Sequence, residues 1–344
     1  MSIDNQLNIC IFRLSAMGDV ILLVQAVRNL LDNNPNATIT VVTRPAFQVF
    51  FGKDDRLHFH DVALHSKHKG IIGLHKLYKE LKEKDFDYFL DMHDVLRSQV
   101  VRSFFKIFRT KVFVIDKDRK TKEAIVSKKL PLTKQKHSIE RYQDVINKTG
   151  LKTAHHYRFI LNRKQLNKSE QITTIGIAPF AAHKSKEWGE INFESLLSTL
   201  SARRNTEILL FGGGDREIAI LEKWENQFEQ VKSVAGKYKL AEELDLMSTC
   251  NCFIAMDSGN MHMASLVGVP TISLWFSTHP NLGFSPWGNA AYCIQPSEKD
   301  APCRPVSVYG KIKTAKQKEC VDKSRALITP EIVLKKIKEI LKET

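Results

Sequence analysis

The chain has 344 residues, of which 43% are hydrophobic and 26% are charged. This composition excludes a disordered, collagen-like or coiled-coil protein, and the length predicts about two domains. The formal net charge is +14. We therefore expect partners that carry negative charge: nucleic acid, a phosphorylated substrate or an anionic membrane surface.

No apolar run approaches the length that spans a bilayer, and the first residues lack the basic start and apolar core of a secretory signal. Any membrane contact is therefore expected to be peripheral. The six cysteines are spread thinly along the chain, which fits a reducing cytoplasm better than a disulfide framework. Cys303 and Cys320 lie in a lysine-rich loop region where they could approach each other, and the pattern assigns them no role.

In the first half, short apolar runs alternate with helical periodicity. A strand at 7–13, a helix at 18–33 and a β-branched strand at 38–43 together predict a βαβ unit. Further elements are expected in chain order: a strand at 86–91, a helix at about 94–108, a strand at 111–115 and a helix at 138–148.

The second half repeats this alternation. The expected elements, in chain order, are a strand at 173–178, a helix at 191–203, a strand at 207–211, helices at 215–228 and 240–248, a strand at 252–256, a helix at 258–267, a strand at 270–276 and a helix at 330–342.

Two successive halves of this kind predict an α/β fold with two Rossmann-like, doubly wound parallel sheets. We place the domains at 1–160 and 161–344, with a linker at about 150–170. The terminal helix belongs to the second domain or packs back on the first. Ligands of such sheets bind beyond the carboxyl ends of the strands, so the cleft between the domains is the expected site.

The turn RLSAMGD at 13–19 joins the first expected strand and helix. Gly18 lets the backbone approach a ligand closely, and Asp19 falls in the first helical turn. Asp19 is either a helix-end acid that satisfies free amides or a general base for a substrate hydroxyl. The local pattern by itself favours the helix-end role.

Three segments of the second half suit anionic ligands. The turn FGGGDRE at 211–217, with Gly213 and Glu217, presents bare backbone at a helix start, where a ribose or phosphate can bind. The turn MDSGNMHMAS at 256–265 offers amides for a diphosphate, or is a capped helix with a packed His262. Lys186 in HKSKEW either reaches a phosphate or lies in an exposed basic loop.

Residues 97–141 contain fourteen Lys or Arg residues and four acidic residues. So strong a bias indicates an anionic acceptor or a headgroup layer. The chain has no P-loop and no zinc-binding spacing. Two D-x-D matches, at 85–87 and 116–118, are weak indications of a metal because acidic residues are common in this chain.

Taken together and in order, the motifs resemble those of glycosyltransferase family 9, the heptosyltransferases of lipopolysaccharide core assembly. The resemblance covers nearly the whole chain. Its segments are RLSAMGDV near the start, LDMHDVLRS at 90–98, APFAAHKSKEWG at 178–189, LLFGGGDRE at 209–217, MDSGNMHMAS at 256–265 and PC…C…ITPEIV near the end.

The resemblance implies a GT-B fold, two Rossmann-like domains facing across a cleft, with no metal and no other cofactor. It implies that Asp19 is the catalytic carboxylate and that Lys186 meets the donor diphosphate. It also implies two sets of binding residues. The donor-binding residues are Gly213, Glu217, Asp257, Ser258, Gly259 and His262. The acceptor-binding residues are Arg97, Arg119 and Lys120.

The activity implied is inverting, metal-independent transfer of a heptose from ADP-heptose to a lipopolysaccharide core or related lipid-linked acceptor. The expected partners are a nucleotide sugar, an anionic lipid-linked saccharide and the inner-membrane surface. The expected location is the cytoplasm, peripherally bound to the cytoplasmic face of that membrane. The sequence assigns no oligomeric state.

Three alternatives belong to other classes. A sugar-nucleotide epimerase of the same architecture would convert a donor without an acceptor. A non-catalytic member of the family would bind an anionic ligand and do no chemistry. A specific nucleic-acid-binding protein is disfavoured, because the basic stretch carries no recognisable module and no interleaved aromatic pairs.

Overall fold

The structure is a computed structural model that describes residues 6–107, 110–163 and 172–342. Residues 164–171 of the expected linker therefore lie outside the described residues. The chain divides into two compact units. Unit 1 comprises Met1–Lys117 and Ser138–Phe159, and unit 2 comprises Asp118–His137 and Ile160–Thr344. Residues 118–137 thus group with unit 2, whereas the division made from the sequence placed them in the first domain.

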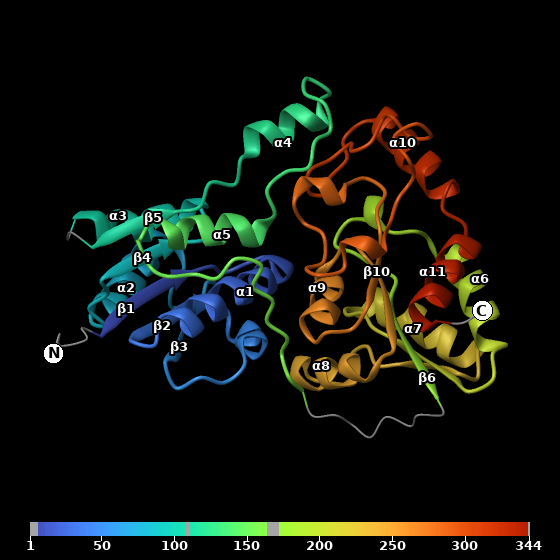
Figure 1. The fold of residues 1–344 in the computed structure, drawn as a ribbon, viewed down its shortest axis with the longest axis horizontal. Helices are drawn as coiled ribbons and strands as arrows, with labels where there is room; N and C mark the ends of the chain where they lie inside the picture. The colour runs from blue at the N-terminus through green and yellow to red at the C-terminus, as the bar shows by residue number, and fades with distance from the viewer. Residues whose placement is uncertain (1–5, 108–109, 164–171, 343–344) are drawn as a thin grey trace. The chain divides into compact units, whose positions relative to one another are not determined.

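Unit 1 is built on a parallel sheet of five strands in the order β3-β2-β1-β4-β5 (Figure 1). Neighbouring strands are in register over their β-branched and aromatic residues; Ile9 of β1, for example, lies between Ile39 of β2 and Tyr88 of β4. The strands are β1 (Leu7–Phe12), β2 (Ala37–Thr43), β3 (Leu57–Asp61), β4 (Tyr88–Asp91) and β5 (Lys111–Val114).

Two pairs of helices and one 3-10 segment complete unit 1. Helix α1 packs against α5, and α2 packs against α3. The second pair covers a core that contains Phe12, Leu77, Phe89 and Phe105. These elements are α1 (Met17–Asn33), the 3-10 helix η1 (Pro45–Phe51), α2 (Gly70–Lys82), α3 (Leu96–Ile107) and α5 (Ser138–Asn147).

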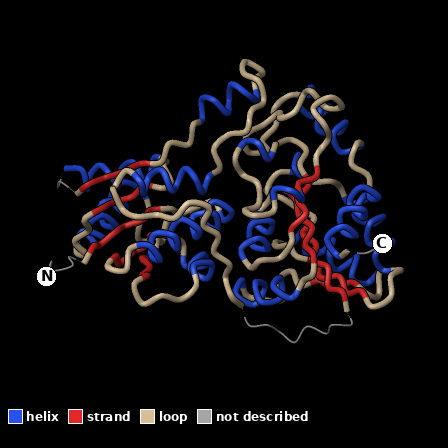
Figure 2. Tube along the Cα trace, viewed as in Figure 1, coloured by secondary structure: helices blue, strands red, loops and turns tan. Residues whose placement is uncertain are grey.

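Unit 2 contains a parallel sheet of six strands in the order β11-β10-β9-β6-β7-β8. Figure 2 shows the strands of this sheet, in red, between blue helices. The strands are β6 (Thr173–Ala178), β7 (Thr206–Leu210), β8 (Val231–Ser233), β9 (Cys252–Met256), β10 (Thr271–Leu274) and β11 (Cys293–Ile294).

Large aromatic side chains are buried in the core of unit 2, among them Phe193 of α6, Trp224 of α7 and Trp188 in the loop before α6. Val333 and Ile337 of the terminal helix join the same core, and this helix contacts α6 within its own unit. The helices are α4 (Arg119–Val126), α6 (Glu190–Ser201), α7 (Asp215–Gln227), α8 (Leu240–Thr249), α9 (Gly259–Leu266), α10 (Ala315–Ala326) and α11 (Pro330–Leu341), with short 3-10 helices η2 (Lys184–Lys186), η3 (Pro280–Leu282) and η4 (Ala290–Tyr292).

The expected α/β class with two parallel sheets is confirmed. Because all strands of a sheet run in one direction, their carboxyl ends meet at one edge, and the loops that follow them gather there. In unit 1 this edge carries Arg13, Val62 and Met92, the residues that follow β1, β3 and β4. In unit 2 it carries the loops after β6, β7, β9 and β10.

Candidate functional site

In unit 1, Asp19 is held by the arginine that ends the same turn. Arg13 Nη2 lies 2.6 Å from Asp19 Oδ2, and the Arg13 side chain is 4% exposed against 31% for Asp19. Arg13 also donates to the carbonyls of Met92 at 2.5 Å and Ser15 at 3.0 Å. Burial opposes the charged form of Arg13, but Asp19, together with Tyr142 and Asp91, more than offsets this, and the pKa of Arg13 is raised.

Asp19 also has the helix-end role that its position suggests. Its Oδ2 accepts a hydrogen bond from the backbone N–H of Ala16 at 3.4 Å, at the start of α1. Tyr142 of α5 donates its hydroxyl to the carbonyl of Asp19 at 3.1 Å, with its ring 5.6 Å from the Arg13 guanidinium. The carboxylate is therefore fixed in position and still partly open to solvent.

A buried histidine lies beside this pair. The backbone N–H of Leu14 points at Nδ1 of His93 at 3.5 Å, and Nε2 of His93 lies 3.4 Å from Ser15 Oγ. A ring that accepts at Nδ1 carries its proton on Nε2 and is neutral. Burial, followed by the charge of Arg13, lowers the pKa of His93 to about 3. The sequence motifs gave His93 no chemical role.

The segment after β4 is held by two carboxylates and an arginine. Arg102 Nη1 lies 2.7 Å from Asp91 Oδ2 and 3.0 Å from Asp94 Oδ1. Asp91 is fully buried and also accepts the backbone N–H groups of His93 and Asp94. Arg97 is exposed in the first turn of α3, near enough to His93 for its charge to contribute to the lowered pKa.

The other two residues expected on the acceptor side lie in the other unit. Arg119 and Lys120 begin α4, are exposed, and belong to unit 2 with residues 118–137. The three residues expected on the acceptor side are therefore divided between the two units.

In unit 2, two of the expected donor residues meet directly. Lys186 Nζ lies 2.8 Å from Asp257 Oδ2, with side chains that are 14% and 9% exposed. They follow β6 and β9, which are neighbours in the sheet, so their loops emerge side by side at the carboxyl edge. Thr278 is fully buried and donates its Oγ1 to the same Asp257 oxygen at 2.7 Å. Thr278 is a site residue that the sequence did not indicate.

The start of α9 has the properties of an anion site. Ser258 is its N-cap in an extended conformation, and the Ser258 Oγ is buried with no hydrogen-bond partner among the described residues. His262 is 7% exposed and lies one helical turn beyond Ser258, on the same side of the helix. A buried hydroxyl and the free amides of the first turn at Gly259 present donors to a negatively charged group.

The glycine turn after β7 lies on the same edge, because β7 pairs with β6. Gly214 has φ of +85°, which requires glycine there, and Gly213 N–H donates to Glu217 Oε2 at 2.9 Å. Burial raises the pKa of Glu217. Glu217 therefore closes its own turn, and a contact with ribose stays a prediction.

Arg304 supports the strand end that carries Thr278. It is 4% exposed, and its guanidinium donates to the carbonyls of Phe276 at 2.6 Å, Thr278 at 2.8 Å and Pro296 at 3.3 Å. Burial lowers the pKa of Arg304 to about 10. No sequence signal pointed to it beyond its place in the final segment of the resemblance.

Cys303, which precedes Arg304, bears on the expected state of the cysteines. Cys303 is joined to Cys320 by a disulfide, so the expectation of reduced cysteines is wrong for this pair. The bond ties the loop that carries Arg304 to α10.

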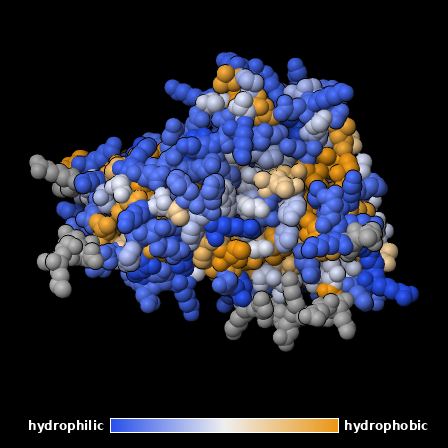
Figure 3. Space-filling view, viewed as in Figure 1, coloured by the Kyte–Doolittle hydropathy of each residue, from blue (hydrophilic) through white to orange (hydrophobic). Residues whose placement is uncertain are grey.

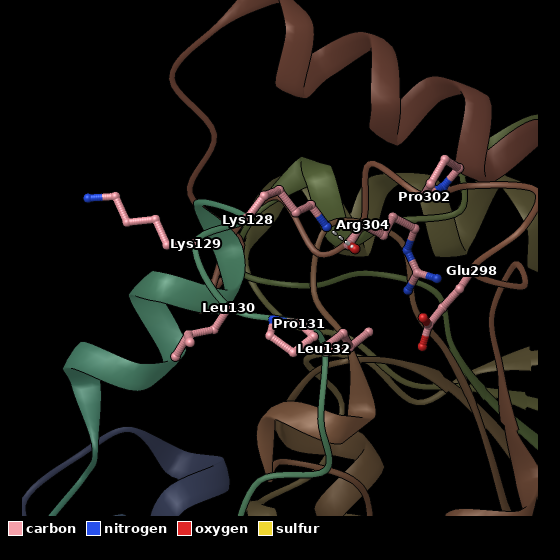
Figure 4. Close-up of a pocket in the computed structure, with 8 residues that line it drawn as sticks. All are labelled: Lys128, Lys129, Leu130, Pro131, Leu132, Glu298, Pro302 and Arg304. Atoms are coloured by element: carbon pink, nitrogen blue, oxygen red, sulfur yellow. Dashed lines mark hydrogen bonds between the residues drawn. The ribbon is translucent and has the colours of Figure 1, made fainter.

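A cavity of about 420 Å³ lies between this loop and the segment that follows α4 (Figure 4). Lys128 reaches across to donate to the carbonyl of Arg304, whereas Lys129 points away. Glu298 adds a carboxylate, and Leu130, Pro131, Leu132 and Pro302 supply apolar walls. Both segments belong to unit 2. The cavity lies where residues 128–132 face the loop at 298–304 of the same unit.

Metal ligands are not grouped in the described part of the chain. Among residues 6–107, 110–163 and 172–342, no three His, Cys, Asp or Glu side chains are arranged to hold a metal ion. Of the D-x-D matches, Asp87 caps the backbone N–H of Asn8 at 2.8 Å. None of the described helices is long and apolar enough to cross a membrane.

Comparison with known proteins gives the family. The family model of glycosyltransferase family 9 (heptosyltransferase) matches residues 74–313, more than half of the chain. The chain belongs to glycosyltransferase family 9. The expected family and enzyme class are thus confirmed: this is a glycosyltransferase of the heptosyltransferase family of lipopolysaccharide biosynthesis.

Relatives and solved structures agree with this assignment. The chain is 22% identical over 305 residues to the lipopolysaccharide core heptosyltransferase OpsX of Haemophilus influenzae. The aligned region covers 86% of each protein. Its fold is similar to a family 9 glycosyltransferase from Veillonella parvula (TM-score 0.73, 20% identity, 100% and 99% of the two chains). It is also similar to E. coli heptosyltransferase WaaC with ADP (TM-score 0.71, 16% identity, 97% and 100%). The GT-B fold is therefore confirmed.

Proposed function

We propose that this family 9 enzyme transfers a heptose from ADP-heptose to a lipopolysaccharide core or related lipid-linked acceptor, with inversion and without a metal. The observation that carries the proposal is the carboxyl edge of the unit 2 sheet. There Lys186, held by Asp257, lies in the segment that follows β6. The neighbouring strand β9 leads into a helix start where the buried Ser258 hydroxyl has no partner among the described residues. A diphosphate is a ligand that both features suit.

In the proposed reaction, unit 2 holds the donor. Lys186 and the amides at Ser258 and Gly259 stabilise the charge that develops on the leaving diphosphate. His262 and the turn with Gly213 and Glu217 complete the nucleotide contacts. The structure of WaaC with ADP supports ADP as the leaving group, because that relative has the same fold.

Unit 1 provides the base and part of the acceptor site. Asp19 takes the proton of the acceptor hydroxyl as its oxygen attacks the anomeric carbon, and the bond from that carbon to the diphosphate breaks. Arg13 contacts Asp19 Oδ2 at 2.6 Å and thereby fixes the direction of the carboxylate. Arg97, and Arg119 and Lys120 from unit 2, are proposed to contact the anionic acceptor. Closure of the units would exclude water from the activated sugar.

We further propose that the protein works in the cytoplasm, at the cytoplasmic face of the inner membrane. The proposal follows from a lipid-linked acceptor and from the net charge of +14. Hydrophilic residues cover most of the molecular face in Figure 3, with smaller hydrophobic patches between them.

The test is calorimetric titration with ADP, UDP, GDP and CDP, followed by a transfer assay with ADP-heptose and a core acceptor. We expect ADP to bind most tightly and transfer to persist in EDTA. Preference for another nucleotide would overturn the donor assignment. Conversion of the donor without acceptor would instead identify an epimerase, and ADP binding without turnover a non-catalytic protein. Activity lost in EDTA and restored by a divalent ion would overturn metal independence.

A further inference from the structure

We infer that the exposed start of α2, together with the loop before it and the first turn of α3, docks unit 1 on an anionic lipid bilayer. This inference rests on the proposed function, because it assigns a surface to the proposed membrane contact. We call residues 65–79 and Leu96–Arg97 the docking surface.

The docking surface exposes large apolar side chains that its own unit does not use. Ile71 is 72% exposed, Ile72 is 88% exposed, and Leu96 at the start of α3 is 76% exposed. The core contacts of α2 come from Leu74, Leu77, Tyr78 and Leu81, whereas Ile72 lies on the opposite side of the helix and Ile71 lies at the edge of the buried face in the first turn. Adjacent exposed isoleucines at a helix start, beside an exposed leucine on the neighbouring helix, indicate a surface that another apolar phase covers.

The charge around these residues is mainly positive. From Val62 to Lys79 the sequence contains four lysines, three histidines and no acidic residue. Lys76 and Lys79 are exposed on the outer side of α2, and Arg97 is exposed beside Leu96. Two bordering acids are paired: Glu80 lies 2.9 Å from Lys67 and within 3.3 Å of His60 and His68, and Asp94 lies 3.0 Å from Arg102.

Apolar side chains ringed by cations are the combination that binds the interface of an anionic bilayer. The apolar groups enter the headgroup–acyl boundary, and the lysines remain at the level of the phosphates. A wholly apolar patch would instead fit a protein partner, and a wholly basic one would fit a soluble polyanion. The docking surface therefore complements an anionic bilayer both in its apolar side chains and in its positive charge.

Its place in unit 1 links it to the chemistry. Helices α1, α2 and α3 each follow a strand of one parallel sheet, so their first turns lie at the carboxyl edge of that sheet. Asp19 lies in the first turn of α1. A bilayer that contacts Ile72 and Leu96 would thus lie along the edge where the proposed base accepts its proton, and a lipid-linked acceptor would need to rise only a short way from it.

The test uses the full chain and co-sedimentation with vesicles of phosphatidylethanolamine and phosphatidylglycerol. We expect the double substitution I71S/I72S to weaken vesicle binding by about tenfold or more. The double substitution K76E/K79E should weaken it as well and reduce its salt dependence. Vesicles of phosphatidylcholine alone should bind the unaltered protein poorly.

Matched controls come from unit 2. Ile191 is 82% exposed at the start of α6, and I191S should bind vesicles normally. Lys335 and Lys338 are exposed on α11 with the spacing of Lys76 and Lys79, and K335E/K338E carries the same change in net charge. Vesicle binding that is unaltered in I71S/I72S, or reduced equally by I191S, would overturn the inference. So would failure of the unaltered protein to bind anionic vesicles.

A second readout separates this inference from the proposed function. In I71S/I72S, ADP affinity and transfer to a deacylated, soluble acceptor should be unchanged, while transfer to the acceptor in vesicles should fall. Vesicle binding that depends on Ile71 and Ile72 without any transfer would uphold the docking surface and reject the proposed activity. Equal loss of transfer to both acceptors would reject the docking role and indicate damage to unit 1.

Discussion

The ammonium group of Lys186 lies 2.8 Å from the carboxylate of Asp257, although 71 positions separate them in the chain. The pair exists because β6 and β9 are neighbours in the sheet. Asp257 holds the lysine ammonium group, and the Thr278 hydroxyl donates a hydrogen bond to Asp257. The proposed donor site is therefore a chain of contacts in which each member positions the next.

We expect K186A to weaken ADP binding roughly 10- to 100-fold, the effect of losing a hydrogen bond to a charged group. Adenosine, which has no diphosphate, should bind the variant and the unaltered protein equally. Calorimetric titration with both ligands measures the difference. An ADP dissociation constant that does not change would remove Lys186 from the donor site.

Thr278→Val keeps the size of the side chain and removes its hydrogen bond to Asp257. We expect ADP binding to weaken roughly fivefold, since one hydrogen bond contributes about 1 kcal/mol. Thr278→Ser retains a hydroxyl and should bind ADP nearly as well as threonine. If valine and serine behave alike, Thr278 does not position Asp257 for the donor.

Asp19→Asn retains the shape of the side chain and removes the base. Turnover should fall by a factor of about 10² to 10⁴, with ADP affinity unchanged. Steady-state kinetics and calorimetry on the same preparation measure both quantities. Near-normal turnover in D19N would leave Asp19 with a structural role only, through its contacts to Arg13 and to the Ala16 amide.

The buried His93 makes unit 1 sensitive to acid. Its pKa is about 3 in the folded protein, against an ordinary value of 6.5. Between these values the unfolded chain binds a proton that the folded one does not, so stability is full above pH 6.5 and is lost as the pH falls. The free energy of unfolding should drop by up to about 1.4 kcal/mol per pH unit from this group.

Hydrogen exchange of the β1 and β4 amides measures the stability of unit 1. Between pH 6.5 and 5, H93N should lose this contribution to the slope. His279 of unit 2 also has a pKa of about 3, through burial, and serves as an internal control. All four tryptophans lie in unit 2, so the slope from tryptophan fluorescence should be the same in H93N. Burial also lowers the pKa of His60 in unit 1, so part of the slope should remain in H93N. A slope for unit 1 that is the same in H93N as in the unaltered protein would contradict the prediction.

Local pattern predicted most of the elements, because their signals lie within a few residues. β6 and β9 have the bounds expected of buried apolar runs. β3, with the sequence LHFHD, was missed because two histidines interrupt its apolar residues. α4 was missed because its lysine-rich sequence hides an amphipathic helix in which Lys122 and Ile125 are buried.

The site shows the same limit. Lys186 and Asp257 were each predicted, but their contact depends on strand order, which local sequence does not encode. Thr278 and Arg304 were missed because both lie in loops without periodicity, and their partners are distant in sequence. Glu217 was predicted as a ribose contact, and only the structure reveals its bond to the Gly213 amide.

Residues 118–137 belong to unit 2 although the segments before and after them belong to unit 1. This grouping has a practical consequence for building hybrids of this enzyme with its relatives. Lys122 lies 4.4 Å from the ring of Phe284, and His137 Nε2 lies 2.8 Å from the carbonyl of Ser285, so this stretch is anchored in unit 2. A swap with a single crossover near position 160 would separate it from those anchors. Exchange of nucleotide specificity between family members should therefore use three crossovers and move residues 118–137 with the carboxy-terminal half.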